Sequence, residues 1–464
     1  MAIDKIINRA ATITVDAASV SDSDNTSTGA FDMPAGTTAQ RPGSANSGQT
    51  RFNSTTGSLE FYDGNAWVST NLIPTITSIT GNINNTYATN LVFAVANNTD
   101  TVDVVFSEGG NAFHTVTGQA VSSGAFTLAV PAAVYGQTAG DTIVISIKNA
   151  DGTPSSNTIS KTVLAAPSGG TITTSGNFRI HTFTSSGTFN AGGLNITNAE
   201  YLVIAGGAGG GSDLGGGGGA GGYRSSVVGQ SSGGGGSAEA RISLSGSTSV
   251  TVGAGGAGGA AVARSNAATH GQAGNDSVFG SITSIKGGGG GAYATDGDTL
   301  RDGVSGGSGG GGASGSTTDI GQGASGTTNQ GYAGGNGKGG GPYAAGGGGG
   351  AGAVGDAAPS NGNKGGDGGD GVSSNITGSA VTRAGGGGGS NYHTPGGGVG
   401  GTGGTGGGGD GAVNQGTGAA NIGDDATVNT GSGGGGGTWT GSGPQLGGAG
   451  GSGIVIVRYD MTVN

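Results

Sequence analysis

Residues 200–219 of the chain read EYLVIAGGAGGGSDLGGGGG. The first five residues are typical of a β-strand, and they pass directly into a run that is almost entirely glycine. A glycine run has no side chains with which to build a core, so any order in it must come from hydrogen bonds between backbone groups. The state of this glycine therefore decides the fold of the larger part of the chain.

Glycine divides the chain into zones. Of the 117 glycines in 464 residues, 103 lie in residues 169–453, where they make up about 36% of the sequence, and none follows Gly453. The transition falls at Pro167-Ser168-Gly169-Gly170. A chain of 464 residues is long enough for about three domains at ~150 residues each. We expect them at 1–71, 72–166 and 167–464.

Three states of the glycine-rich zone are less favoured. Collagen needs glycine at every third position and abundant proline, whereas this chain has 10 prolines and glycine runs of five. A flexible Gly/Ser linker is the default for such a composition. Residues 271–280 nearly match one calcium-binding β-roll repeat, but no tandem copies follow, so we expect Asp276 in a turn before a strand instead of on calcium.

The fourth state is a bundle of parallel and antiparallel polyproline-II helices made of glycine, known as polyglycine II. Each helix has three residues per turn and no internal hydrogen bonds, so its amides must bond to neighbouring helices. Only glycine lets six neighbours approach that closely. Ordering glycine is entropically costly, and a dense lattice of hydrogen bonds can offset that cost. We favour this state.

Short strand-like runs surround the glycine insertions in the third zone. They lie at residues 178–183, 200–204, 240–244, 249–252, 277–279, 282–285 and 454–459. Together they predict an all-β head, a jelly-roll sandwich whose loops carry the polyglycine II insertions.

The middle zone, residues 72–166, predicts one immunoglobulin-like β-sandwich. Seven alternating runs recur about every ten residues, at 75–80, 90–96, 101–106, 112–117, 125–130, 141–148 and 158–164, with Asn-, Gly- and Pro-rich turns between them. We expect this domain to act as a structural spacer. A ligand-binding module is the alternative.

The first zone predicts a small β-meander with strands at 50–53, 58–62 and 66–68. An isolated meander of this size cannot bury Phe52, Phe61 and Trp67, because isolated hairpins are marginal in water. We therefore expect these three residues to pack against copies of the chain, which makes them the oligomerisation candidates.

Composition argues against several classes of protein. The net charge is −11 without a basic block, so we expect no nucleic-acid partner. No cysteine is present, which excludes disulfides and thiolate metal sites. The start of the sequence lacks the apolar run of a signal peptide, and no stretch approaches a transmembrane span. We expect a protein that is made in the cytosol and released by lysis.

Catalytic chemistry is also absent from the pattern. Four histidines are scattered without a partner at ligand or triad spacing, so we expect no catalytic residue, no metal and no cofactor. Three acidic pairs, Asp367/Asp370, Asp296/Asp298 and Asp424/Asp425, imitate a glycosidase dyad, although solvated loops are the favoured interpretation. A polysaccharide depolymerase remains the minor, enzymatic alternative.

Two parts of the sequence resemble known families. The first is carried by GAFDMPAGTTAQRP at 29–42, RFN at 51–53, GSLEFYDG at 57–64 and Trp67. It resembles a short module of tail fibres and other structural proteins of tailed bacteriophages. The second is carried by HTFTSSGTF at 181–189, EYLVIAGG at 200–207, GGAGGYR at 218–224 and GSGIVIVRY at 451–459. It resembles glycine-rich domains of phage fibres and the tumour-necrosis-factor-like glycine-rich domain of anaplastic lymphoma kinase.

The resemblance implies a homotrimeric, non-enzymatic virion fibre. On this hypothesis residues 1–71 attach to other virion proteins, and the head of a tail fibre binds a glycan or an outer-membrane protein of the host. A capsid-surface fibre or decoration protein is the main alternative, and a bacterial surface adhesin is another. The expected location is the virion surface.

Solitary aromatic residues are the candidates for receptor binding. Tyr332, Tyr343, Tyr392, His393 and Trp439 stand alone among glycines. Pro342, Pro395 and Pro444 lie close by in the sequence and would stiffen the turns. Aromatic rings stack on sugar faces and carry polar edges, which suits a host ligand. Equally, these rings could simply seal the ends of the glycine bundle against water.

Overall fold

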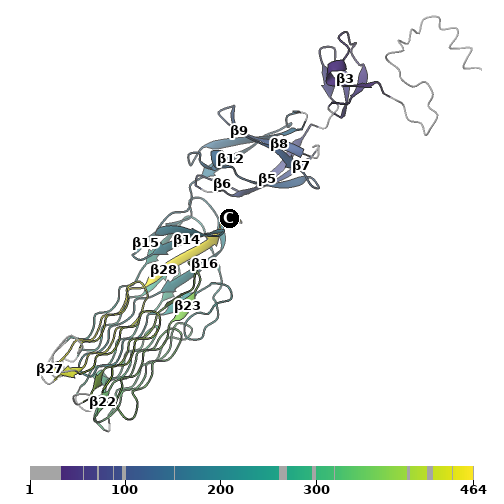
Figure 1. The fold of residues 1–464 in the computed structure, drawn as a ribbon. Helices are drawn as coiled ribbons and strands as arrows, with labels where there is room; N and C mark the ends of the chain where they lie inside the picture. Colours follow the sequence, from purple (N-terminus) through teal and green to yellow (C-terminus); the bar gives the residue numbers. More distant parts are fainter. Residues whose placement is uncertain are drawn as a thin grey trace, which may run out of the picture. The chain divides into compact units, whose positions relative to one another are not determined.

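The computed structural model describes residues 33–55, 57–69, 73–86, 88–96, 101–150, 152–260, 269–294, 299–317, 319–393, 398–414, 422–440 and 443–462. Within these ranges the protein is all-β, as predicted, and its helical elements are α2 (Ala132–Tyr135), η1 (Thr38–Gln40) and η2 (Thr299–Arg301). The chain forms two compact units (Figure 1), one from residues up to 163 and one from residues 164–464, which also takes in the loop 84–89.

The first unit begins with a four-stranded sheet in the order β1-β2-β3-β4. Its strands are β1 (Ala35–Gly36), β2 (Thr50–Asn53), β3 (Ser58–Tyr62) and β4 (Trp67–Ser69). The three predicted strands form the antiparallel meander, and β1 adds to it in parallel with β2. Gly57 adopts a φ of +65° in the turn between β2 and β3, where glycine is the residue that fits without strain.

The same unit contains a sandwich of two sheets. One sheet has the order β10-β7-β5 and the other the order β6-β12-β11-β8-β9. The strands are β5 (Thr75–Thr80), β6 (Ile83–Asn84), β7 (Asn90–Ala96), β8 (Thr101–Glu108), β9 (Asn111–Ala120), β10 (Ala125–Ala129), β11 (Thr142–Asn149) and β12 (Ile159–Leu164). Taken in chain order, this is the arrangement of immunoglobulin domains, with strands A, B and E facing strands G, F, C and C′.

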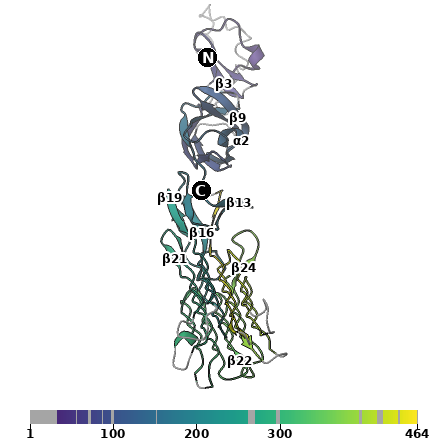
Figure 2. The same ribbon diagram turned by 90° about the vertical axis from the view of Figure 1, so that its left-hand side faces the viewer.

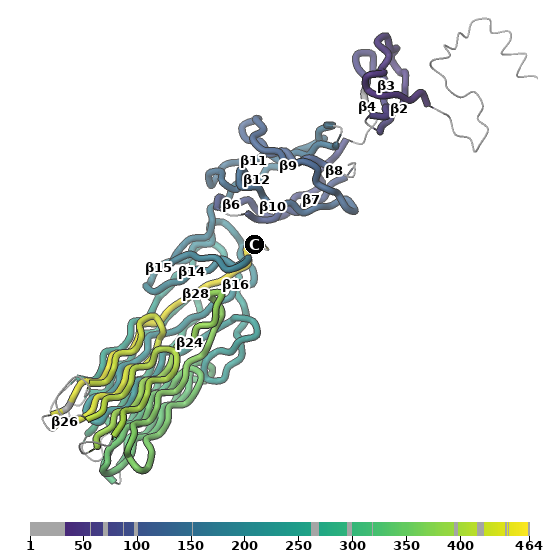
Figure 3. Tube along the Cα trace, viewed as in Figure 1, coloured from purple at the N-terminus to yellow at the C-terminus, as the bar shows by residue number. Residues whose placement is uncertain are grey.

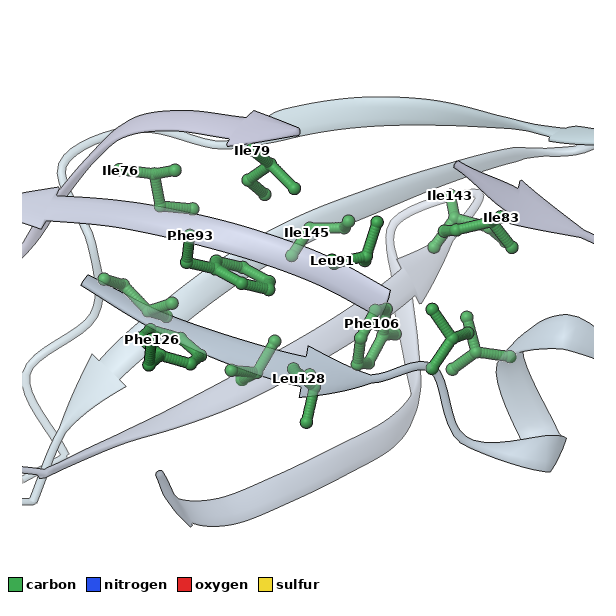
Figure 4. Packing of buried hydrophobic residues seen from close by; sticks show 14 of the residues in the cluster. Ile76, Ile79, Ile83, Leu91, Phe93, Phe106, Phe126, Leu128, Ile143 and Ile145 are labelled. Atoms are coloured by element: carbon green, nitrogen blue, oxygen red, sulfur yellow. The ribbon is translucent and has the colours of Figure 1, made fainter. Parts of the chain in front are cut away.

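Alternation along the strands of this sandwich builds its core (Figure 4). Leu91, Phe93 and Val95 on β7 point inward, and Ile143, Ile145 and Ile147 on β11 face them from the other sheet. The rings of Phe93 and Phe126 stack at 4.5 Å with an interplanar angle of 8°. Every second residue on the facing strands of both sheets is buried, as the prediction of a β-sandwich requires.

The second unit starts and ends in a further sandwich (Figure 2). One sheet contains β13 (Thr171–Ser175), β14 (Phe178–Phe183), β28 (Ile454–Asp460), β16 (Ile196–Ile204) and β17 (Tyr223–Ser225) in that order, with β18 (Ile242–Leu244) also paired to β16. The other sheet contains β15 (Gly187–Asn190), β19 (Ser247–Thr251), β20 (Ser277–Phe279) and β21 (Ile282–Ser284). The last strand, β28, lies between β14 and β16, antiparallel to both.

The larger sheet of this sandwich is covered on both faces. Tyr201, Val203 and Val457 pack toward the smaller sheet, in a core that also contains Phe189 and Phe279. Leu202, Ile204 and Ile456 on the opposite face pack under the segments that follow β16 and β23 (Val372–Ser374). This double burial explains why β16 and β28 read as continuous apolar runs instead of alternating ones.

Beyond the sandwich, the glycine-rich segments run back and forth beside one another (Figure 3). Amides three residues apart bond to the same neighbouring segment: the amide of Gly217 donates to the oxygen of Gly346 at 3.1 Å, and that of Ala220 donates to Gly349 at 3.0 Å. The amide of Gly218, which lies between them, donates to a different segment at Gly434, at 2.8 Å. A period of three with bonds only to neighbours is the signature of polyglycine II, so the prediction is confirmed.

The segment 215–222 shows how complete this lattice is. It donates to segments 346–349, 431–437 and 285–291, and it accepts from segments 205–211, 308–314 and 387–390. Segment 346–349 runs parallel to it and the other five run antiparallel, as their hydrogen-bond partners show. Six neighbours satisfy its backbone on every side, so no side-chain core is needed.

The close approach of the backbones explains the composition. A Cβ on Gly217 would lie 2.0 Å from the carbonyl oxygen of Gly387, and one on Gly348 would lie 2.0 Å from that of Gly218. Ordinary carbon–oxygen contacts are about 3.3 Å or longer. Only glycine fits at these positions, because any Cβ would overlap a carbonyl group of the neighbouring segment.

Candidate functional site

The glycine segments end in turns at the tip of the second unit, which we define as the end far from the β13–β21 sandwich (Figure 1). Two short ribbons lie there: β22 (Tyr343–Ala344) pairs with β25 (Asn391–Tyr392), and β26 (Trp439–Thr440) pairs with β27 (Gly443–Pro444). A third hairpin, β23 with β24 (Val381–Arg383), lies at the sandwich end. The tip ribbons each hold an aromatic residue in a fixed register.

Five side chains line one pocket of about 290 Å³ at the tip: Leu214, Tyr293, Tyr343, Tyr392 and Trp439. Tyr343 is the cross-strand partner of Tyr392, and their ring centroids lie 6.1 Å apart with the rings tilted by 52°. Leu214 enters from the turn between segments 205–211 and 215–222, where its φ is +58°. Residues from five distant parts of the sequence therefore meet at one place.

Polar contacts order the turns next to two of these aromatic residues. The Arg301 guanidinium is 1% exposed, forms an ion pair with Asp319 at 2.7 Å and lies 5.6 Å from the centre of the Tyr293 ring. Near Tyr343, the Lys338 ammonium donates hydrogen bonds to three turn carbonyls, those of Gly339, Gly340 and Pro342. Such contacts order the turns before any ligand arrives, which lowers the entropic cost of binding.

The pocket offers aromatic faces, aliphatic surface and the polar edges of phenol and indole groups. None of its five lining side chains carries a charge at neutral pH. Pockets of this kind suit neutral ligands that combine an apolar face with hydroxyl groups, such as a sugar ring, or an apolar side chain of a protein loop.

The structure brings together three of the five predicted receptor-binding residues, namely Tyr343, Tyr392 and Trp439. His393 follows Tyr392 but is not among the side chains that line the pocket. Tyr332 lies near the sandwich end: its amide donates to Gly350, and its hydroxyl lies 2.9 Å from the position of a Cβ on Gly235.

Leu214 and Tyr293 were not predicted from the sequence. The sequence did contain a signal for them. Leu214 is the first large side chain after the glycine run 206–211, and Tyr293 is the first after the run 287–291.

The predicted oligomerisation residues divide between the two faces of the N-terminal sheet. Phe52 and Phe61 are 38% and 36% exposed and share one face with Leu59. Trp67 lies on the opposite face, where its ring is tilted against Tyr62 at a centroid distance of 5.6 Å. Trp67 thus lies on the other face of the sheet from the two phenylalanines, because it pairs with Tyr62 and neighbouring positions along a strand point to opposite faces.

The acidic pairs have structural partners within the described ranges. Asp367 accepts hydrogen bonds from the amide and hydroxyl of Thr402, and Asp370 accepts the same two bonds from Thr405. Burial alone would raise the pKa of Asp367, but bonds from Lys364 and Thr402 lower it below its ordinary value. These carboxylates serve as acceptors for amides at the rim of the lattice.

Asp424 lies close to two other carboxylates. The pKa of Asp424 is raised by burial and by the charges of Asp410 and Asp425. Asp276 precedes β20, as predicted, and accepts a bond from the Lys286 amide at 2.8 Å. Asp296 and Asp298 lie outside the described residues. Among the residues that the structure describes, no three His, Asp or Glu side chains are placed to hold a metal ion.

Comparison with protein families matches residues 183–460 to the glycine-rich domain family. This chain belongs to that family. The match begins at the end of β14 and ends at the end of β28, so the glycine-rich domain contains nearly all of the sandwich core, the whole polyglycine II lattice and the tip pocket. A comparison with curated proteins gave no match. In the described part of the chain, no helix has the length and apolar character needed to cross a bilayer.

Proposed function

We propose that this protein is a non-enzymatic fibre of a bacteriophage virion, and that its glycine-rich domain attaches the particle to the host surface through the tip pocket. The observation that carries the proposal is the gathering of Tyr343, Tyr392 and Trp439 around one pocket, although about fifty residues separate each from the next along the chain. A lattice composed of glycine needs few large side chains for its own stability, yet Tyr343, Tyr392 and Trp439 lie together at its tip.

Binding is favoured over a purely structural role because the rings do not close on one another. Tyr343, Tyr392 and Trp439 are each only partly buried, and a pocket of about 290 Å³ remains open between them. Rings that merely sealed the lattice would be expected to pack without such a space. The ligand that fits is a neutral host glycan or an apolar loop of an outer-membrane protein.

Replacing Tyr343, Tyr392 and Trp439 together by Ala tests the tip site. Adsorption of the purified protein to host cells should fall at least tenfold while the melting temperature of the head changes little. Tyr332→Ala is the matched control, because it removes a partly buried tyrosine at the opposite end of the lattice and should leave adsorption unchanged. A large drop in melting temperature with adsorption retained below that temperature would identify the rings as structural caps.

The N-terminal sheet supports self-association, for which we propose a homotrimer. Phe52, Leu59 and Phe61 form a contiguous exposed apolar face, with Phe52 and Leu59 directly paired across β2 and β3. Light scattering should then give three times the chain mass of 43.1 kDa, and Phe61→Glu should reduce that mass. A wild-type protein that remains a monomer at micromolar concentration would overturn this part of the proposal.

The proposed place of the protein on the particle is the tail, with residues 1–71 joined to other virion proteins. Antibody labelling of intact particles tests it directly. Label at the tail supports a tail fibre, whereas label distributed over the capsid would favour a capsid-surface fibre.

A further inference from the structure

The N-terminal sheet is polar on its covered face. Glu60 is fully buried and accepts hydrogen bonds from Arg41 at 2.7 and 3.1 Å and from Asn53 at 3.1 Å. A second guanidinium, that of Arg51, lies beside the same carboxylate, with its Nε 3.3 Å from a Glu60 oxygen. Two cations thus share one anion, which leaves this cluster with a net charge of +1.

Arg51 and Trp67 both have buried donors without an acceptor. Arg51 is 4% exposed, and its Nη2 donates to the Thr37 oxygen at 3.0 Å, but no acceptor meets its Nη1 among the residues that the structure describes. The indole Nε1 of Trp67 is likewise buried with no acceptor in the described part of the chain. A buried donor without an acceptor is destabilising relative to a bonded one, and an uncompensated buried charge is more so.

A pocket of about 210 Å³ adjoins both side chains. Its lining includes Pro34, Gln40, Pro42, Gln49, Arg51 and Trp67. The side-chain oxygens of Gln40 and Gln49 already accept bonds from the amides of Thr37 and Asn46. Their amide NH₂ groups are therefore the parts that can face a ligand. The pocket thus offers hydrogen-bond donors and the positive charge of Arg51, with Pro34 and Pro42 as its apolar lining.

We propose that this pocket binds a carboxylate carried by a protein partner, such as an Asp or Glu side chain in an extended segment. A carboxylate supplies two acceptor oxygens for Arg51 and Trp67 and balances the excess charge. The protein source follows from β1, which forms the edge of the sheet and contributes Ala35 to the pocket. An extended segment added to this edge would carry its side chain to the pocket. The site stands whether or not the head binds a host surface.

Fluorescence of the full-length chain tests this proposal. The chain has two tryptophans, so Trp439→Phe leaves Trp67 as the single reporter. Titration with the blocked tripeptide acetyl-Gly-Asp-Gly-amide should change its emission saturably, the Asn tripeptide should have no effect, and acetate should need at least tenfold higher concentration. No response to the Asp tripeptide, or an equal response to the Asn tripeptide, would overturn the site, and equal potency of acetate would overturn a protein-borne ligand.

Two variants in the same background separate binding from folding. Arg51→Gln should abolish the response, but it also disturbs the Glu60 cluster. Gln49→Ala removes a pocket-lining amide from an exposed position outside that cluster, and it should weaken the response at least tenfold with an unchanged melting temperature. Val92→Ala, at an exposed position of the immunoglobulin-like sandwich, is the control and should bind as the parent does. A parent-like response from Gln49→Ala would contradict the assignment of the pocket.

Discussion

Substitution Gly218→Ala introduces one methyl group at the centre of the best-surrounded segment of the lattice. The new Cβ would lie 2.2 Å from the carbonyl oxygen of Ala208 and 2.7 Å from that of Gly209. An ordinary carbon–oxygen contact of about 3.3 Å requires segment 205–211 to retreat by ~1 Å. The lattice has no side chains that can turn aside, so the backbone itself must move.

The cost follows from the hydrogen bonds that this retreat breaks. Segment 205–211 donates three bonds to 215–222, from Ala205, Ala208 and Gly211, at 3.1, 3.0 and 2.9 Å. Each bond contributes about 1 kcal/mol net, which gives a loss of about 3 kcal/mol. Alanine also lowers the conformational entropy of the unfolded chain, which stabilises the folded head by about 0.5–1 kcal/mol and offsets part of this loss. We expect a net loss of about 2–3 kcal/mol, or ~5–10 °C in the melting temperature of the head.

Thermal melts followed by circular dichroism measure this difference. Gly187→Ala is the matched control, since the added Cβ would meet only the Phe183 ring at 3.9 Å, and it should melt within about 2 °C of the wild type. If Gly218→Ala melts like Gly187→Ala, the glycine segments are not packed as described, and the reasoning from close approach is refuted.

Buried groups of the two sandwiches make three further outcomes measurable. Burial lowers the pKa of the His181 imidazole from its ordinary 6.5 to about 4, so the unfolded chain binds this proton more tightly than the folded head does. The head should keep its full stability above pH 6.5 and lose up to about 3 kcal/mol as the pH falls from 6.5 to 4; His181→Phe should remove this loss in melts compared at pH 7 and 4.5. Glu200→Gln leaves the Arg458 guanidinium buried without its carboxylate and should cost the head about 3 kcal/mol, so an unchanged head melt would contradict the pair. Phe93→Ala removes a fully buried ring stacked on Phe126 and should destabilise the immunoglobulin-like sandwich by about 3–5 kcal/mol; calorimetry should show the head melt unmoved, and a shift in both melts would argue against separate units.

Strands with a clear periodicity could be predicted from the sequence. All seven runs expected in the middle zone are strands, and β5 and β7 begin and end where the alternation does. The short strands β6, β13 and β17 could not be predicted, because two or three residues give no period and β13, Thr171–Ser175, is mostly hydroxyl side chains.

The polyglycine state could be predicted from composition, but the partners of each segment could not. One glycine run resembles every other, so nothing in the sequence of 215–222 distinguishes its six neighbours from the remaining segments. The lengths of the runs and the few interruptions set the register. For the same reason Tyr332 could not be separated from Tyr343: both stand among glycines, but they lie at opposite ends of the lattice.

The N-terminal sheet shows a different limit of pattern reading. Alternation in Arg51-Phe52-Asn53 and in Leu59-Glu60-Phe61 fixes two faces, but not which of them is covered. Aromatic residues would ordinarily be assigned to the covered face. Here the preceding loop covers the polar face, because Arg41 and η1 bring partners for Glu60 and Arg51, and the apolar face stays exposed.

Hydrogen exchange followed by mass spectrometry tests most directly whether the glycine segments form one hydrogen-bonded lattice that holds the tip pocket. Peptides from 205–222 should be compared with peptides from β28 in the same sample. If the lattice exists, the amides of 215–222 exchange as slowly as those of β28, since both open only when the head unfolds. Exchange of 215–222 at random-coil rates while β28 stays protected would contradict it.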